Sequence, residues 1–294
     1  MKDLNNKVAV VTGAGSGIGR ALSVCLTEEG CSLVLADVSE SGLEQTRDML
    51  GNTGGRVSTH VLDVADREAV LSFASEAEAH HGQIDLLINN AGLLLCEYLE
   101  NVSFQDFEWV MGVNFWGVVN CSKAFLPSLK KRPEAHIVTV SSVAGLITTP
   151  TNGPYAASKS AVQAFTETLC QELDSTNVGV SCVLCGGVRT CIFRNAPRFT
   201  SATAEMSAEE AICWYENAAK STPEVAAQAI VNGVKKNKRR ILVGKDAYVT
   251  DLFARIAPST SNQFAGYLMR NLNKTDPRYW GRLIISMIRP KKKA

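Results

Sequence analysis

Val8-Ala9-Val10-Val11-Thr12-Gly13-Ala14-Gly15-Ser16-Gly17-Ile18-Gly19 is the stretch of this 294-residue chain that decides the fold. It begins with an apolar, mostly β-branched run, which predicts a strand buried on both faces. Apolar residues then recur at helical spacing from Arg20 to Glu29. Glycines between a strand and a helix let the backbone approach a pyrophosphate, and the helix N-terminus offers it N–H groups. The residues predicted to bind a dinucleotide here are Gly13, Ser16, Gly17, Ile18 and Gly19.

Strand and helix patterns keep alternating downstream of this turn. Further strands are predicted at 32–37, 56–62, 84–88, 136–140, 178–184 and 240–243, and helices at 66–80, within 104–131 and from residue 155. Alternation of this kind indicates a parallel sheet with helices on both faces. We therefore expect an α/β fold with a doubly wound parallel sheet (Rossmann fold) in a single domain, residues 1–244, followed by a C-terminal helical extension.

Two segments fall outside the alternation. Residues 191–222 contain Pro197 and stretches rich in Ser, Thr and Ala, and an insertion after a strand of this kind predicts a substrate lid. Residues 245–294 are the predicted extension, with apolar faces at 248–256, 264–272 and 279–288.

The composition excludes several classes of protein. A formal net charge of +1 creates no overall field that would attract nucleic acid, and no apolar run approaches the roughly 18 residues needed to span a bilayer. The chain enters its first strand pattern without a signal peptide, which predicts a cytoplasmic protein. Cys182 and Cys185 form a C-x-x-C without a second ligand pair, so we expect buried structural thiols and no metal site.

Asp37 ends the predicted strand 32–37. A carboxylate at this place can accept hydrogen bonds from the adenosine ribose, and it would repel a 2′-phosphate. No Arg or Lys lies in the glycine turn or directly after Asp37. The sequence therefore favours NAD over NADP, although a helix N-cap would also explain the acid.

Tyr155 and Lys159 are four residues apart in a helix that Pro154 can begin. A free phenol has a pKa of about 10, and a neighbouring ammonium favours the phenolate. The pair could be a chance arrangement on a surface helix. The dinucleotide turn upstream favours catalysis instead, with Tyr155 as the proton-transfer group.

The chain resembles the short-chain dehydrogenase/reductase family from about residue 6 to 243. Thr12-Gly13-x3-Gly17-x-Gly19 matches the cofactor turn of that family, and Asn89-Asn90-Ala91-Gly92 matches its sheet-stabilising motif. The resemblance implies a catalytic tetrad of Asn114, Ser142, Tyr155 and Lys159. It also implies that the cofactor is bound by Asp63, Val64, Asn90, Ala91, Gly92, Tyr155, Lys159, Gly186, Val188 and Thr190.

The same resemblance implies a role for each member of the tetrad. Tyr155 is expected to be the general acid/base, and Lys159 to lower its pKa and to bind the nicotinamide ribose. Ser142 is expected to hold the substrate oxygen, and Asn114 to support a proton-relay water. Taken alone, Ser142 could be a turn residue and Asn114 a buried polar group. The family usually has proline where this chain has Cys185, a departure expected to loosen the turn beneath the nicotinamide.

The predicted substrate is a secondary alcohol or ketone on an apolar skeleton, because few charges are expected around the site. Core packing would explain the leucines near Gly92 equally well. The predicted substrate residues are Leu94, Ser142, Ile147, Tyr155, Gly187, Ile192 and Phe193. An NADPH-dependent ketone reductase and a non-catalytic dinucleotide-binding regulator are the alternative functions.

Two further expectations concern partners. The segments 115–125 and 157–169 are apolar on more than one face, which predicts a homodimer or homotetramer. Residues 279–289 run from Tyr279-Trp280 to Arg289 and are followed by Pro290 and three lysines. They predict either a helix packed on the lid or on a partner subunit, or a peripheral membrane contact.

Overall fold

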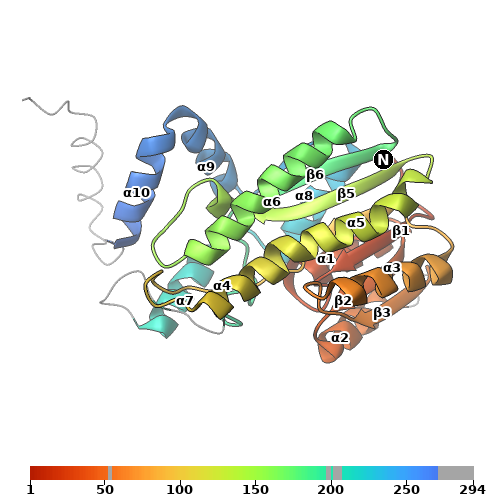
Figure 1. Ribbon diagram of the computed structural model, residues 1–294, viewed down its shortest axis with the longest axis horizontal. Helices are drawn as coiled ribbons and strands as arrows, with labels where there is room; N and C mark the ends of the chain where they lie inside the picture. The colour runs from red at the N-terminus through yellow and green to blue at the C-terminus, as the bar shows by residue number, and fades with distance from the viewer. Residues whose placement is uncertain (52–54, 197–199, 201–206, 271–294) are drawn as a thin grey trace, which may run out of the picture.

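The computed structural model describes residues 1–51, 55–196, 200 and 207–270. Within these ranges a seven-stranded parallel sheet has the order β3-β2-β1-β4-β5-β6-β7 (Figure 1). The strands are β1 (Val8–Thr12), β2 (Ser32–Asp37), β3 (Val57–Val61), β4 (Leu86–Asn89), β5 (Ala135–Ser142), β6 (Val178–Cys185) and β7 (Arg240–Val243). The predicted doubly wound α/β fold is confirmed. Its strand order reverses between β1 and β4, where such sheets bind ligands.

The helices begin where local signals place them. Ser39, Asp66, Ser103, Ser207 and Thr222 each accept a backbone N–H at a helix start, the usual role of an N-cap. The helices are α1 (Gly17–Glu28), α2 (Glu40–Leu50), α3 (Arg67–His81), α4 (Phe104–Met111), α5 (Gly117–Lys130), α6 (Gly153–Glu172), α7 (Ala208–Ala218), α8 (Pro223–Lys235), α9 (Lys245–Ile256) and α10 (Pro258–Arg270). A π-helical turn (Gly112–Trp116) joins α4 to α5.

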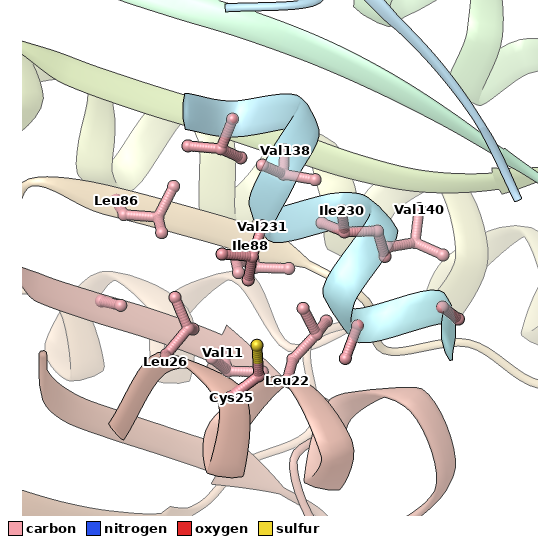
Figure 2. Close-up of a cluster of buried hydrophobic side chains, with 14 of the residues drawn as sticks. Val11, Leu22, Cys25, Leu26, Leu86, Ile88, Val138, Val140, Ile230 and Val231 are labelled. Carbon is pink, nitrogen blue, oxygen red and sulfur yellow. The ribbon is translucent and has the colours of Figure 1, made fainter. Parts of the chain in front are cut away.

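Helices cover both faces of the sheet, and each face has its own apolar core. On one face, α1 and α8 pack against each other and on the sheet, and Figure 2 shows Leu22 of α1 and Ile230 of α8 in one buried cluster with Ile88 of β4. On the other face, α3, α5 and α6 pack on the sheet, with Phe73 and Phe125 in edge-to-face contact at 5.5 Å. With both faces covered, the open rim at the carboxyl ends of the strands is the place left for a site.

Three helices gather at one end of the molecule. Figure 1 shows α7, α9 and α10 at the end opposite the N-terminus, beyond the region where β5 and β6 end. The helix α7 lies in the segment expected to be a lid, and α9 and α10 begin the expected C-terminal extension. The segment 279–289 and the lysines at 291–293 lie outside the described residues, so their expected packing or membrane contact stays a prediction.

Exposed aromatic side chains mark the surface of α4 and the π-helical turn. Phe104 is 86% exposed, and the Trp109 and Trp116 side chains are also exposed. Large apolar side chains in water are consistent with an interface, and the homo-oligomer stays a prediction. None of the helices in the described ranges combines the length and the apolarity needed to cross a bilayer.

His136 makes the stability of the fold sensitive to acid. Its ring is buried on β5 with Nε2 2.8 Å from the Ser181 hydroxyl, and burial lowers its pKa to about 3. The folded protein therefore keeps His136 neutral, whereas the unfolded chain takes up a proton as the pH falls below about 6.5. We expect the free energy of unfolding to fall by about 2 kcal/mol through this residue between pH 7.5 and pH 5.

Urea unfolding of the parent and of His136→Gln at both pH values measures this contribution. The variant keeps a hydrogen-bonding side chain near Ser181 but cannot titrate. Because all other histidines are common to both proteins, the parent should lose more stability in acid than the variant does. Equal losses would show that His136 does not carry the effect.

Candidate active site

A cavity of about 440 Å³ opens at the carboxyl ends of the central strands. Its walls come from the turns after β1, β2 and β4, from the end of β5 and from α6. The predicted cofactor residues that line it are Gly13, Ser16, Gly17, Ile18, Asp37, Asp63, Val64, Asn90, Ala91, Gly92, Tyr155, Lys159 and Thr190. Segments far apart in the sequence therefore meet at one site.

The glycine turn is fixed against the turn after β4. Thr12 Oγ1 accepts hydrogen bonds from the backbone N–H groups of Asn90 and Ala91, at 3.0 and 3.1 Å. Gly13 has a φ of 66°, and a Cβ on it would lie 2.8 Å from the Ala91 Cα. Only glycine fits this close approach. Gly19, predicted to bind the cofactor, does not line the cavity; it is buried where α1 crosses the carbonyl of Gly13.

Asp37 is held in place by backbone donors. Its Oδ2 accepts from the Gly15 N–H at 2.8 Å, and its Oδ1 accepts from the Ser39 N–H at 2.9 Å. The N-cap of α2 is Ser39, whose side chain accepts from Gly42, so Asp37 is not the cap. The carboxylate instead lines the cavity at the end of β2.

The cavity fits a nicotinamide dinucleotide. Gly13 and Gly17 have positive φ values and no side chain to fill the space beside the N-terminus of α1. Backbone N–H groups at a helix start suit a pyrophosphate, and the Asp37 carboxylate suits ribose hydroxyls. At the other end, Tyr155 and Lys159 complete the cavity wall.

Tyr155 lies beside Lys159 on α6, with the Lys159 Nζ 5.6 Å from the centre of the phenol ring. The expectation that Lys159 lowers the pKa of Tyr155 stays a prediction. Burial has the larger effect and raises the pKa of Tyr155, and a hydrogen bond with the Ser142 hydroxyl opposes it. The Tyr155 side chain is therefore a neutral phenol at pH 7, suited to donate a proton.

Lys159 is an ammonium buried in the protein. Its side chain is only 4% exposed, and its Nζ donates to the Val140 carbonyl at 3.1 Å. Burial lowers its pKa to about 8, because few groups replace the lost solvation. Buried lysines with shifted pKa values are typical of functional sites.

Asn114 lies in the π-helical turn Gly112–Trp116 and is fully buried. Its amide accepts from the Leu93 N–H at 2.8 Å and donates to the Leu93 carbonyl and to the Ser158 hydroxyl, both at 3.0 Å. These bonds fix the chain that follows Gly92. The amide thus positions the backbone, and a role of Asn114 in a proton relay stays a prediction.

A second cavity of about 510 Å³ adjoins the first at Tyr155. The predicted substrate residues Leu94, Ser142, Ile147, Tyr155, Gly187, Ile192 and Phe193 all line it. Gly186 and Val188, predicted to bind the cofactor, line this cavity rather than the first. The phenol of Tyr155 therefore stands between the first cavity, which we call the cradle, and the second cavity, which we call the apolar chamber.

Sequence reasoning missed part of the chamber wall. Besides α7, which lies in the segment expected to be a lid, side chains of α9 and α10 line it, among them Phe253 and Phe264. The helical spacing of apolar residues in α9 and α10 was visible in the sequence. It could not show which surface those faces would meet.

Asp246, at the start of α9, was also missed. Its Oδ2 accepts from the Gly187 N–H at 2.6 Å, and the Gly186 N–H donates to the Val243 carbonyl at 2.9 Å. The turn after Cys185 is therefore held by two hydrogen bonds. The expected loosening of this turn is not seen, because Asp246 and Val243 hold it from a distant part of the chain.

Comparisons with known proteins agree on one family. The family model for short chain dehydrogenase matches residues 7–200. SadH of Mycobacterium tuberculosis, named as an oxidoreductase, is 43% identical over 262 residues, 88% of this chain and 94% of SadH. The 3-oxoacyl-[acyl-carrier-protein] reductase FabG of Thermotoga maritima is 33% identical over 201 residues, 68% of this chain and 82% of FabG.

A solved structure has the same fold over nearly its whole length. It is a short chain dehydrogenase/reductase from Burkholderia phymatum in complex with NAD, with a TM-score of 0.78 and 32% identity. The match covers 94% of this chain and 99% of that one.

The buried ammonium of Lys159 should cost stability. The pKa of lysine is 10.5 in the unfolded chain and about 8 in the folded protein. The loss of folding stability is therefore largest below pH 8 and disappears as the pH rises to 10.5. Replacing Lys159 with methionine removes the charge and keeps an unbranched side chain. We expect Lys159→Met to be more stable at pH 7 by about 2 kcal/mol, after allowing for the lost hydrogen bond to Val140.

Urea unfolding without added dinucleotide at pH 7 and pH 10 measures this gain. The gain should shrink at the higher pH. Lys123→Met, at an exposed position on α5, is the matched control and should stay within about 0.5 kcal/mol of the parent. A Lys159→Met protein less stable than the parent at pH 7 would contradict the prediction.

Proposed function

Because the chain belongs to the short-chain dehydrogenase/reductase family, we propose that it transfers a hydride between NAD(H) and a secondary alcohol or ketone on an apolar skeleton. The observation that carries this proposal is the place of Tyr155. Its phenol lines both the dinucleotide cavity and the apolar chamber, and it is hydrogen-bonded to Ser142. In the reductive direction a ketone, NADH and a proton give an alcohol and NAD⁺.

The residues of the chain have distinct tasks in this proposal. The nicotinamide, when bound, supplies or accepts the hydride. The Ser142 hydroxyl holds the substrate oxygen, and Tyr155 donates its proton to that oxygen as the carbonyl is reduced. Lys159 places a positive charge beside the developing phenolate, which stabilises it more in the transition state than in the resting phenol. In alcohol oxidation Tyr155 accepts the proton, so oxidation should be favoured as the pH rises.

The proposed cofactor is NAD. The Asp37 carboxylate would meet a 2′-phosphate without a free cation beside it. Arg20 is near, but its guanidinium donates to the carbonyls of Gly15 and Gly42 and to the side chains of Gln45 and Thr46. An NADPH-dependent ketone reductase is the alternative and would require Arg20 to leave these partners.

A non-catalytic dinucleotide-binding regulator is the alternative from another class. Such a protein would need the cradle but not the proton donor. Ser142, Tyr155 and Lys159 line the two cavities, and Asn114 is buried behind them with a hydrogen bond to Ser158, which favours an enzyme.

Tyr155→Phe should abolish turnover while sparing NADH binding. The change removes the hydroxyl that transfers the proton and little volume, and losing a positioned acid typically lowers the rate by about 10²–10⁴-fold. Ketone reduction and alcohol oxidation should be assayed by NADH absorbance, and NADH affinity by fluorescence titration. The control is Tyr248→Phe, at an exposed position on α9. Activity of Tyr155→Phe within tenfold of the parent would sink the assignment.

Asp37 should set the choice of cofactor. We expect the parent to prefer NAD over NADP by at least about tenfold in kcat/KM, because a carboxylate beside a 2′-phosphate costs about 1.4 kcal/mol or more. Asp37→Asn keeps the size of the side chain and should lower that preference by about tenfold. Equal efficiency with both cofactors in the parent would show that the ribose assignment is wrong.

A further inference from the structure

The helix α10 places one face against the apolar chamber beside Tyr155. Five side chains of α10 line the chamber, and their spacing of i, i+3, i+4, i+7 and i+8 is that of a single helical face. They are Ser261, Phe264, Ala265, Leu268 and Met269. Asn262 and Gln263, on other sides of the helix, are exposed. An apolar helix face normally packs on a core, whereas this one borders a space large enough for a ligand.

The helix is held across the chamber at several points. Near its start, Asn262 Oδ1 accepts from the Thr148 N–H at 2.8 Å and from the Thr148 hydroxyl at 3.1 Å. Phe264 meets Phe253 of α9 edge-to-face at 5.8 Å. Towards its end, the Tyr215 hydroxyl of α7 lies 3.8 Å from the Met269 sulfur. These contacts fix the position of α10 relative to Tyr155.

The lining of the chamber selects the chemistry of a ligand. Among the described residues, no Asp, Glu, Lys or Arg side chain lines it, and the hydrophobic lining predominates. A charged group placed there would lose its hydration without a partner, which costs several kcal/mol. The chamber therefore suits a neutral, mostly apolar molecule.

The volume of the chamber sets the size of that molecule. A cavity of about 510 Å³ lies within the range of pockets that bury most of a small organic ligand, about 300–1,000 Å³. A small alcohol would leave most of this space empty. An elongated molecule would instead reach from Tyr155 to the face of α10.

We propose that α10 is a substrate-binding helix, and that the substrate is an elongated, uncharged ketone or secondary alcohol whose apolar portion contacts this face. The proposal rests on the proposed function, because Tyr155 must act on the oxygen at the near end. The residues that set the accepted length then lie outside the part of the chain that the family model matches, residues 7–200.

Ala265 is the position that tests this proposal. It is the smallest side chain of the face and lies next to Phe264 and one turn from Leu268. A phenylalanine at 265 would fill chamber volume without introducing charge. Gln263→Phe adds a comparable ring two residues away, at an exposed position, and is the matched control.

The experiment compares reduction of butanone, decan-2-one and the carboxylate 9-oxodecanoate by the parent and both variants. In the parent, kcat/KM for decan-2-one should exceed that for butanone by at least about tenfold, since each additional methylene buries apolar surface against the chamber. Ala265→Phe should lower the ratio of kcat/KM for decan-2-one to that for butanone by about tenfold. Gln263→Phe should match the parent, and 9-oxodecanoate should be at least about tenfold poorer than decan-2-one.

A binding measurement without turnover separates the two proposals. Decan-2-ol should raise the Tm of the parent and of Gln263→Phe, and Ala265→Phe should show less of this shift. Ala265→Val, a smaller change, should give an intermediate length profile even if the phenylalanine variant fails to fold.

Ketone reduction with a length profile that Ala265 does not alter, or equal use of 9-oxodecanoate, would overturn the role of α10 alone. Decan-2-ol binding that depends on Ala265, without turnover of any ketone, would overturn the proposed function instead.

Discussion

A parallel sheet covered by helices on both faces is the constraint on which the rest of this structure depends. Its two cores bury both faces of the central strands, so polar groups that must reach a ligand do so at the rim where these strands end. The strand order reverses between β1 and β4, and the turns after these strands diverge there. The cradle lies between the turns after β1 and β4. The chamber lies beside it, at the ends of β5 and β6.

Burial at this rim determines the protonation of the site. Burial raises the pKa of Tyr155 and so keeps its phenol neutral. Burial also lowers the pKa of Lys159, so its ammonium loses a proton more easily than an exposed lysine does. Neither property follows from the pair alone, since an exposed tyrosine and lysine would keep their ordinary values. The amide of Asn114 contributes differently, by fixing the backbone of Leu93 next to the pair. Position and burial together make ordinary side chains suited to proton transfer.

The sequence predicts those features of the site that depend on short segments. The glycine turn, the acid at the end of β2 and the spacing of Tyr155 and Lys159 are each contained within a dozen residues, and the structure places them as expected. Features that depend on distant segments were missed. Asp246 meets Gly187 across about sixty residues of chain, and the direction of the apolar face of α10 depends on where α7 and α9 lie. The effect of burial on the pKa of Tyr155 was missed for the same reason, because solvation depends on the whole fold.

The hydrogen bond between Gly187 and Asp246 has a consequence for transplanting specificity between relatives. A Cβ on Gly186 would overlap the Asp246 carboxylate, so the acid in this position requires glycine at 186. A chimaera that receives α9 and α10 from another protein must therefore inherit both partners. The point of exchange then lies before Gly186, because a graft at the boundary between β7 and α9 would replace Asp246 and lose its hydrogen bond to Gly187.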